Sequence, residues 1–255
     1  MSKLDEFDNL VKVINELRLK CPWDKSQTNK TLRTLTIEEC YELSDAIVNN
    51  DQNSIKKELG DILTHIIFYS VLAEEKKIFS LRDVITSQTK KLITRHPHIY
   101  GSKKNLSESE VKKNWEAIKL NEKASGNSVL SGVPSSLPTM LKSWRIQEKV
   151  RGIGFQWAKK EGYIKKMEEE FFELKKEIVD SNKNKMEEEL GDFMFSIISF
   201  SYFLKLNPVD ALEKANQKFI NRFSKMEQLI KDKGDRIQDL NTSEFEKYWE
   251  KAKVL

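Results

Sequence analysis

The sequence has few of the residues that interrupt or cross-link a chain. Its 255 residues include 9 glycines, 5 prolines and 2 cysteines. So little glycine and proline argues against a turn-rich β-sandwich or barrel, which needs a turn after every short strand. Cys21 and Cys40 alone do not make the disulfide framework of a small secreted protein. We therefore expect an all-α protein with reduced thiols in the cytoplasm.

The chain also lacks a long apolar run and a large excess of one charge. Its two main uncharged apolar stretches, 62–73 and 193–204, have 12 residues each, whereas a membrane-spanning helix needs about 20. The first residues are charged and lack the apolar centre of a signal peptide. The formal net charge is +4, with Lys and Glu mixed along the chain, so no basic stripe for nucleic acid is expected. We expect partners other than nucleic acid or a membrane.

What the sequence does contain is an internal repeat. The segment Glu-Leu-Gly-Asp at 58–61 recurs at 189–192, and the Glu-Glu pair at 38–39 recurs at 169–170, 131 residues further along in each case. An apolar run follows both copies at the same offset. Equal spacing of this kind indicates a tandem duplication. We expect one module at 1–120, a linker rich in Ser, Gly and Pro at 121–139, and a second module at 140–255.

The spacing of apolar residues predicts where the helices lie. In the first module they are expected at 4–20, 34–49, 52–77 and 80–95. In the second they are expected at 139–151, 160–180, 183–206 and 208–233, with a short helix from 243. Pro208 after Asn207 marks one helix start, and Thr242 with the acidic residues after it resembles a capping box. A helical piece near 111–121 is expected to interrupt the linker.

Paired carboxylates occur at the same places in both modules. Residues three apart on a helix share a face, so two facing helices would bring four carboxylates together. The sets are Glu39, Glu42, Glu58 and Asp61 in the first module, and Glu170, Glu173, Glu189 and Asp192 in the second. Four carboxylates would repel one another unless they hold a hard divalent cation, Mg²⁺ or Mn²⁺ as a substitute. A di-iron bundle would use Glu-x-x-His pairs, and none of the three histidines lies three residues after a Glu.

Each module also has a glycine inside the second helix of the carboxylate pair. Gly60 and Gly191 occupy interior helical positions, where glycine is less favourable than alanine by about 1 kcal/mol. Because both modules have this unfavourable glycine at the same helix position, we expect two helices to approach closely there, beside the metal.

Together these motifs resemble the MazG family of nucleoside triphosphate pyrophosphohydrolases over nearly the whole chain. Besides the two carboxylate sets, the resemblance rests on Cys21-Pro22-Trp23-Asp24, Arg95-His96-Pro97-His98, Asn114-Trp115-Glu116, Gly132-Val133-Pro134, Gly154-Phe155 and Lys218-Phe219 with Arg222-Phe223. It implies Mg²⁺-dependent hydrolysis of a broad range of nucleoside triphosphates, NTPs and dNTPs, to the monophosphate and pyrophosphate. It also implies a homodimer, in which pairing completes four-helix-bundle-like cores.

The resemblance implies site residues mainly in the second module. Its metal ligands would be Glu170, Glu173, Glu189 and Asp192, with the first-module set as a second site. Nucleotide contacts would come from Lys166, Met167, Glu168, Glu169, Glu170, Lys185, Met186, Glu187, Glu188, Asp192, Asn216, Lys218, Phe219, Ile220, Asn221, Arg222 and Trp249. Lys218 and Arg222, four apart on one helix face, suit the charge on a leaving pyrophosphate and join the four carboxylates as catalytic candidates.

Several alternatives stay open at this point. Glu169 or Glu173 can serve as the base that takes the proton of the attacking water. Trp249 can stack on a nucleobase or simply pack the last helix. The chain can also be a catalytically silent nucleotide-binding or dimerisation module that regulates a partner, or a pyrophosphatase narrow for one nucleotide such as dUTP.

Overall fold

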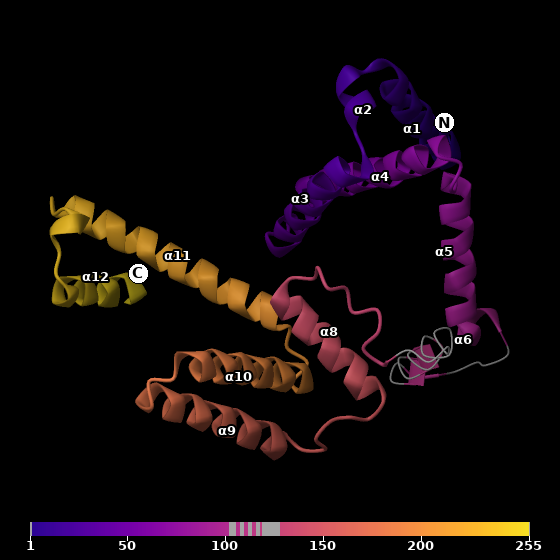
Figure 1. Ribbon diagram of the computed structural model, residues 1–255. Coiled ribbons are helices and arrows are strands. Elements are labelled where there is room, and N and C mark those ends of the chain that lie inside the picture. The colour runs from indigo at the N-terminus through magenta and orange to yellow at the C-terminus, as the bar shows by residue number, and fades with distance from the viewer. Residues whose placement is uncertain are drawn as a thin grey trace. The chain divides into compact units, whose positions relative to one another are not determined.

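The computed structural model describes residues 2–101 and 128–254, together with 106, 107, 110, 111, 114, 115 and 118 between them. Every regular element in this described part is a helix, which confirms the all-α prediction (Figure 1). The chain divides into two compact units, Met1–Ser107 and Glu108–Leu255. Of the helical piece expected near 111–121, residues 111, 114, 115 and 118 are described and are helical, whereas its other residues lie outside the described part. The limits of the modules stay a prediction. No helix in the described chain has the length and apolar character needed to cross a membrane.

The first unit contains two long antiparallel helices and shorter ones around them. Its helices are α1 (Lys3–Lys20), α2 (Pro22–Ser26), α3 (Asn29–Val48), α4 (Gln52–Glu75), α5 (Leu81–Arg95) and α6 (Pro97–Tyr100). The prediction that α3 begins at 34 is wrong, because Thr28 starts it earlier. The Thr28 hydroxyl accepts from the Thr31 N–H, and the Thr31 hydroxyl accepts from the Thr28 N–H at 2.8 Å. Two of the four otherwise unpaired N–H groups of the helix start are thereby satisfied.

The core of the first unit is apolar and lies where α1 crosses the α3–α4 pair. Ile14, Leu32 and Phe68 are buried there with Ile67 and Leu72. Arg18 closes one end of this core. Its guanidinium pairs with the Glu75 carboxylate, with Nε 2.6 Å from Oε1, and donates through NH1 to backbone carbonyls of the α2 turn.

The second unit repeats the antiparallel pair. Its helices are α8 (Thr139–Gly152), α9 (Lys160–Val179), α10 (Lys183–Phe203), α11 (Pro208–Asp232) and α12 (Thr242–Val254), with a 3₁₀ turn at Ile237–Asp239. α9 and α10 lie side by side, α8 packs on α10, and α12 packs on α11. Asn207 caps α11 as expected, since its side-chain oxygen accepts from the Val209 N–H at 3.0 Å.

The cap of α12 differs by one residue from the prediction. Asn241, not Thr242, forms the capping box: its side-chain oxygen accepts from the Glu244 N–H, and the Glu244 carboxylate accepts from the Asn241 N–H at 2.9 Å. An asparagine side chain fills this role as well as Ser or Thr. α11 and α12 share an apolar cluster around Met226, Ile230 and Tyr248.

Candidate active site

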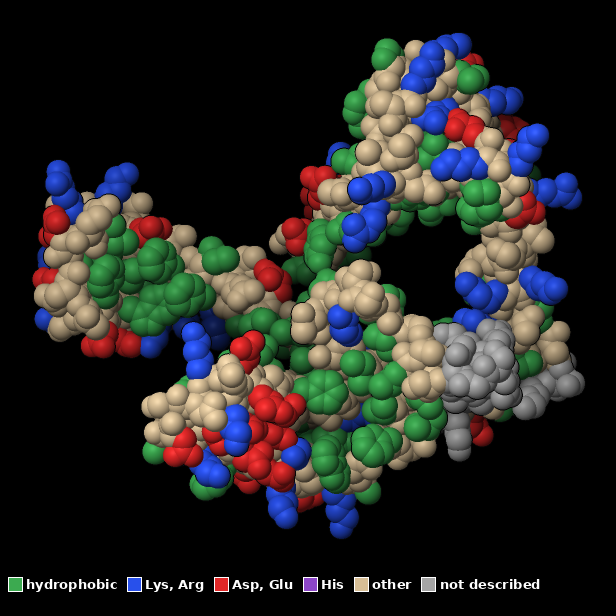
Figure 2. Space-filling view, viewed as in Figure 1, with side chains coloured by type: hydrophobic (Ala, Val, Ile, Leu, Met, Phe, Trp, Pro, Cys, Tyr) green, Lys and Arg blue, Asp and Glu red, His purple; other side chains and the backbone are tan. Residues whose placement is uncertain are grey.

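The carboxylates of the second unit meet where α9 faces α10. Oxygens of Glu170, Glu189 and Asp192 lie within 4.8 Å of one another, and so do oxygens of Glu169, Glu170 and Glu173. Glu170 belongs to both groups and joins them into one acidic cluster. Figure 2 shows acidic side chains gathered over these two helices. The four ligands expected from the sequence are therefore brought together.

A tight turn between the two helices sets this alignment. Ser181 has a φ of 53°, in the left-handed region, and the next residue, Asn182, caps α10 by accepting from the Lys185 N–H. The first unit has the same kind of turn, in which Asn50 has a φ of 55° and Asp51 caps α4. Equal turns place equivalent positions of each helix pair opposite one another. The duplicated spacing in the sequence thus becomes duplicated geometry.

The electrostatics of the cluster fit a bound cation. Glu170 is only 5% exposed, and an isolated buried carboxylate is strongly disfavoured. Desolvation, followed by the charges of Glu173 and Glu170, raises the pKa of Glu189. These groups offer oxygen ligands alone, which is the donor set of hard divalent cations. A divalent cation among these oxygens would offset the repulsion between the carboxylates, which contributes to the raised pKa of Glu189.

Lys166 supplies one positive charge to this cluster. Its Nζ lies 2.6 Å from a carboxylate oxygen of Glu169 and 2.6 Å from one of Glu170. Hydrogen bonds to Glu169 and then Glu170 hold the pKa of Lys166 above its usual range, and the same contact lowers the pKa of Glu169. Lys166 therefore stays charged at the edge of the site, where a phosphate oxygen can replace a carboxylate as its partner.

The first unit brings the three equivalent carboxylates together in the same way but differs in the residues around them. Glu39, Glu58 and Asp61 come within 4.8 Å of one another, but Glu42 lies outside this group. Lys57 lies among them, with its Nζ 3.0 Å from Glu58, 3.7 Å from Asp61 and 3.8 Å from Glu42. The second unit has Glu188 at the position equivalent to Lys57. Each set is thus partly neutralised by one lysine, Lys57 in the first unit and Lys166 in the second, at positions that are not equivalent.

The expected close approach at the two helix glycines is wrong within this chain. A Cβ built on Gly60 or on Gly191 meets nothing within 4 Å among the described atoms outside its own helix turn. Neighbouring Leu59 and Leu190 are 53% and 47% exposed. Both glycines therefore lie on open faces of their units.

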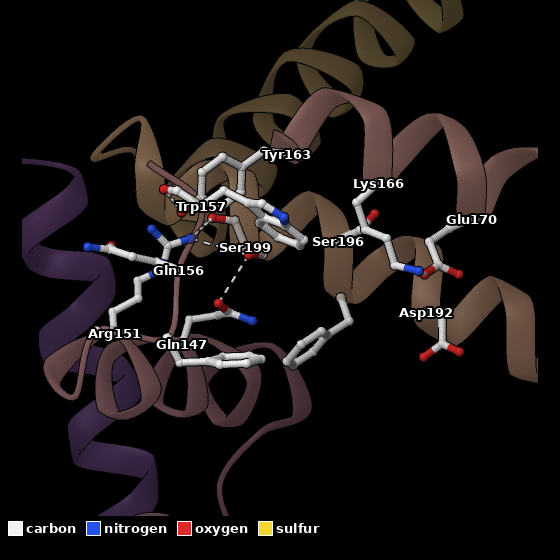
Figure 3. A pocket seen from close by; sticks show the side chains of 13 residues that line it. Gln147, Arg151, Gln156, Trp157, Tyr163, Lys166, Glu170, Asp192, Ser196 and Ser199 are labelled. Atoms are coloured by element: carbon white, nitrogen blue, oxygen red, sulfur yellow. Dashed lines mark hydrogen bonds and ion pairs between the residues drawn. The ribbon is translucent and has the colours of Figure 1, made fainter. Parts of the chain in front are cut away.

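A cavity adjoins the acidic cluster of the second unit (Figure 3). Its volume is about 540 Å³, and Glu170, Asp192 and Lys166 lie at one end of its lining. Arg151, Trp157 and Tyr163 line it further in, with polar side chains from α8 and α10. Sequence reasoning missed these deeper residues. The available signal was the pair Ser196 and Ser199, which interrupts an otherwise apolar run.

The other expected nucleotide contacts lie on several elements. Met167 and Glu168 are on α9, and Met186, Glu187 and Glu188 are on α10 with Lys185, whose Nζ is 4.0 Å from Glu177. Asn216, Lys218, Phe219, Ile220, Asn221 and Arg222 are on α11. Trp249 on α12 packs against Phe219, with ring centroids 5.1 Å apart. In the described chain these α11 and α12 residues do not line the cavity, and no hydrogen bond or ion pair joins them to the acidic cluster.

Known proteins match the chain over nearly its whole length. A family model described as the MazG nucleotide pyrophosphohydrolase domain matches it twice, over residues 27–100 and 158–226. A Thermotoga maritima protein named nucleoside triphosphate pyrophosphohydrolase/pyrophosphatase MazG is 41% identical over 97% of this chain and 95% of its own. A nucleoside triphosphate pyrophosphohydrolase of Escherichia coli K12 is 33% identical over 98% of both chains. YabN of Bacillus subtilis, named as uncharacterized, is 36% identical over 97% of this chain and 52% of its own. Both family matches contain a set of paired carboxylates.

Proposed function

The chain belongs to the MazG nucleotide pyrophosphohydrolase family, and from this membership we propose that it hydrolyses nucleoside triphosphates to the monophosphate and pyrophosphate. Its relatives in Thermotoga maritima and Escherichia coli carry the name of that activity. The observation that carries the proposal is the joining of Glu170, Glu189 and Asp192 into one acidic cluster beside a cavity. A cavity of about 540 Å³ is within the usual size of small-molecule sites, ~300–1,000 Å³.

We propose Mg²⁺ as the metal, with Mn²⁺ as a substitute. Glu170, Glu173, Glu189 and Asp192 would hold it, since all four are carboxylates of the cluster and Mg²⁺ favours a few carboxylates together with water and phosphate oxygens. When bound, the ion would neutralise phosphate charge and favour ionisation of a water. The site of the second unit is the proposed principal one, because Glu173 belongs to a carboxylate group with Glu170, whereas its counterpart Glu42 belongs to no such group among the described residues.

The chain's own residues then have distinct tasks. Lys166 would exchange its carboxylate partners for a phosphate oxygen and so orient the triphosphate. Lys218 and Arg222 remain proposed contacts of the leaving pyrophosphate, and Trp249 a proposed contact of the nucleotide. Glu169 and Glu173 both remain proposed bases: Glu169 is held by Lys166 at 2.6 Å, and Glu173 makes no hydrogen bond among the described residues but is also a proposed metal ligand.

We also propose that the protein is a homodimer. On α9 and α10 of a single chain, Phe171, Phe172 and Met194 are 48%, 69% and 50% exposed. Apolar groups this exposed beside one another favour an interface, and a second helix pair would complete a four-helix core. The open face at Gly191 would admit a close partner helix. Sedimentation equilibrium should give twice the chain mass for wild type and a lower mass for Phe172→Glu; a monomeric wild type would contradict the dimer.

Hydrolysis in ¹⁸O-labelled water tests the proposed reaction. Attack on the α-phosphorus should leave the label in the monophosphate and none in the pyrophosphate, for nucleotides with different bases. A chelator should stop the reaction, and Mg²⁺ or Mn²⁺ should restore it. Label in orthophosphate, or a reaction that ignores the chelator, would show that the proposal is wrong. Activity with dUTP alone would support the narrow pyrophosphatase instead.

A further inference from the structure

The two units, although copies of one module, differ inside the space between the first helix and the helix pair. In the first unit this space is filled by apolar side chains. Ile14, Leu32 and Phe68 are exposed by only 1%, 2% and 4%. They pack against one another in the core, so no room for a ligand remains at this place.

In the second unit two of these three positions are polar. Tyr163 and Ser199 correspond to Leu32 and Phe68, 131 residues earlier. Gln147 corresponds to Ile14, because each lies four residues before an arginine, Arg151 or Arg18. Gln147 and Ser199 are each 6% exposed. The cavity of about 540 Å³ opens among them. Buried polar groups are nearly always hydrogen-bonded to protein, water or a ligand, so this lining suits a polar ligand.

A chain of hydrogen bonds fixes how Gln147 faces the cavity. Arg151 donates through NH2 to the Ser199 backbone carbonyl at 2.7 Å and to the Ser199 hydroxyl at 3.2 Å. A guanidinium only donates, so the hydroxyl is left to give its proton to the Gln147 Oε1, 3.1 Å away. Among the described residues the Gln147 Nε2 has no partner, and in Figure 3 it points away from Ser199 into the cavity. The floor of the cavity therefore presents an unpaired amide donor.

An aromatic ring forms a wall of the same cavity. The Trp157 indole lies against Gly162, where a Cβ would come within 2.6 Å of the indole Cγ. Tyr163 supports it from the side, with ring centroids 4.9 Å apart at 77°, and donates from its hydroxyl to the Trp157 carbonyl. The ring position is thus set by a glycine and a neighbouring ring that meets it edge-on. Trp157 remains 46% exposed, so ring surface is free to receive a flat ligand.

We propose that this pocket of the second unit binds the base of the substrate nucleotide, against Trp157 and with a base acceptor atom on the Gln147 Nε2. The inference rests on the proposed function, because the triphosphate would extend from the pocket to Glu170 and Asp192 at its other end. Every common base has an acceptor on its edge and a flat face. One donor and one ring therefore accept all of them. The first unit has no base pocket, since Ile14 and Phe68 occupy it.

Gln147→Leu tests the proposal, with Gln228→Leu on the exposed face of α11 as the matched control. Each variant is assayed on guanosine triphosphate and on ribose 5-triphosphate, which has no base. Gln147→Leu should lower kcat/KM for the nucleotide by at least ~10-fold and leave the base-free substrate unchanged. Gln228→Leu should change neither. Equal effects of Gln147→Leu on both substrates would overturn the assignment.

Two further measurements separate this proposal from the proposed function. If Trp249→Leu, rather than Gln147→Leu, removes the preference for a base, the base stacks on α12 and the pocket assignment is wrong. If wild type hydrolyses no triphosphate, binding of guanosine is followed instead by tryptophan fluorescence. Binding that Ser199→Phe abolishes, in a variant with unchanged circular dichroism, would support the pocket; absence of guanosine binding to wild type would refute it.

Discussion

Replacing Asp192 with asparagine should change stability in opposite directions without and with a divalent cation. Oxygens of Asp192, Glu170 and Glu189 lie within 4.8 Å of one another. At that separation, two like charges in water-like surroundings repel by about 0.9 kcal/mol. Loss of one charge should therefore stabilise the metal-free second unit by about 1 kcal/mol, which raises Tm by ~2–4 °C.

A bound cation should reverse that order. At a free Mg²⁺ concentration 100 times its Kd, wild type gains about 2.7 kcal/mol, whereas Asp192→Asn, with a weakened site, gains much less. Differential scanning calorimetry with a chelator and then with Mg²⁺ measures both effects. High salt should shrink the metal-free gain, because exposed charges are screened.

Asp61→Asn is the matched control in the first unit. Lys57 Nζ lies 3.7 Å from Asp61, so removal of that carboxylate loses an attraction as well as a repulsion, and little metal-free gain is expected. The reasoning is refuted if Asp192→Asn lowers Tm in the chelator and responds to Mg²⁺ as wild type does. Equal gains from both variants would show that Lys57 does not neutralise the first set.

Two further predictions concern the scaffold. Arg18 lowers the pKa of Glu75, so this carboxylate stabilises the fold above its ordinary pKa of 4.5 and loses that contribution as the pH falls through the lowered value. Since Glu75 is 43% exposed, Glu75→Gln should cost about 1 kcal/mol at pH 7 and progressively less in acid; urea midpoints that differ equally at pH 7 and pH 3 would contradict this. Gly162→Ala should destabilise by about 1–3 kcal/mol because it displaces the Trp157 indole, whereas Gly60→Ala, which meets nothing within 4 Å, should stabilise by about 0.5–1 kcal/mol. If urea unfolding showed that both glycine substitutions change the free energy of unfolding in the same direction, the packing described at Trp157 would be contradicted.

The sequence predicted what depends on local spacing. Helix existence follows from apolar periodicity, and the acidic cluster follows from Glu and Asp three residues apart on two helices. Cap positions were less secure, because an N-cap is a single side chain whose partner depends on the turn before it. Thr28 and Asn241 both start helices at places that periodicity alone does not mark.

What the sequence did not predict depends on packing between helices. Lys57 of α4 reaches Glu42 of α3 only because these two helices face each other at a matching height. The pocket needs Gln147 of α8 to meet Ser199 of α10 across 52 residues of chain. An alignment of the two copies does point to the pocket, because polar residues of the second copy stand where the first copy has apolar core residues.

Release of pyrophosphate tests the central claim most directly. The rates for wild type, Asp192→Asn and Asp61→Asn are compared with Mg²⁺ and a nucleoside triphosphate. The account predicts equal amounts of monophosphate and pyrophosphate from wild type, a loss of at least ~100-fold for Asp192→Asn, and most of the activity retained in Asp61→Asn. Pyrophosphate release that survives in Asp192→Asn, or that is lost only in Asp61→Asn, would contradict a catalytic centre between α9 and α10.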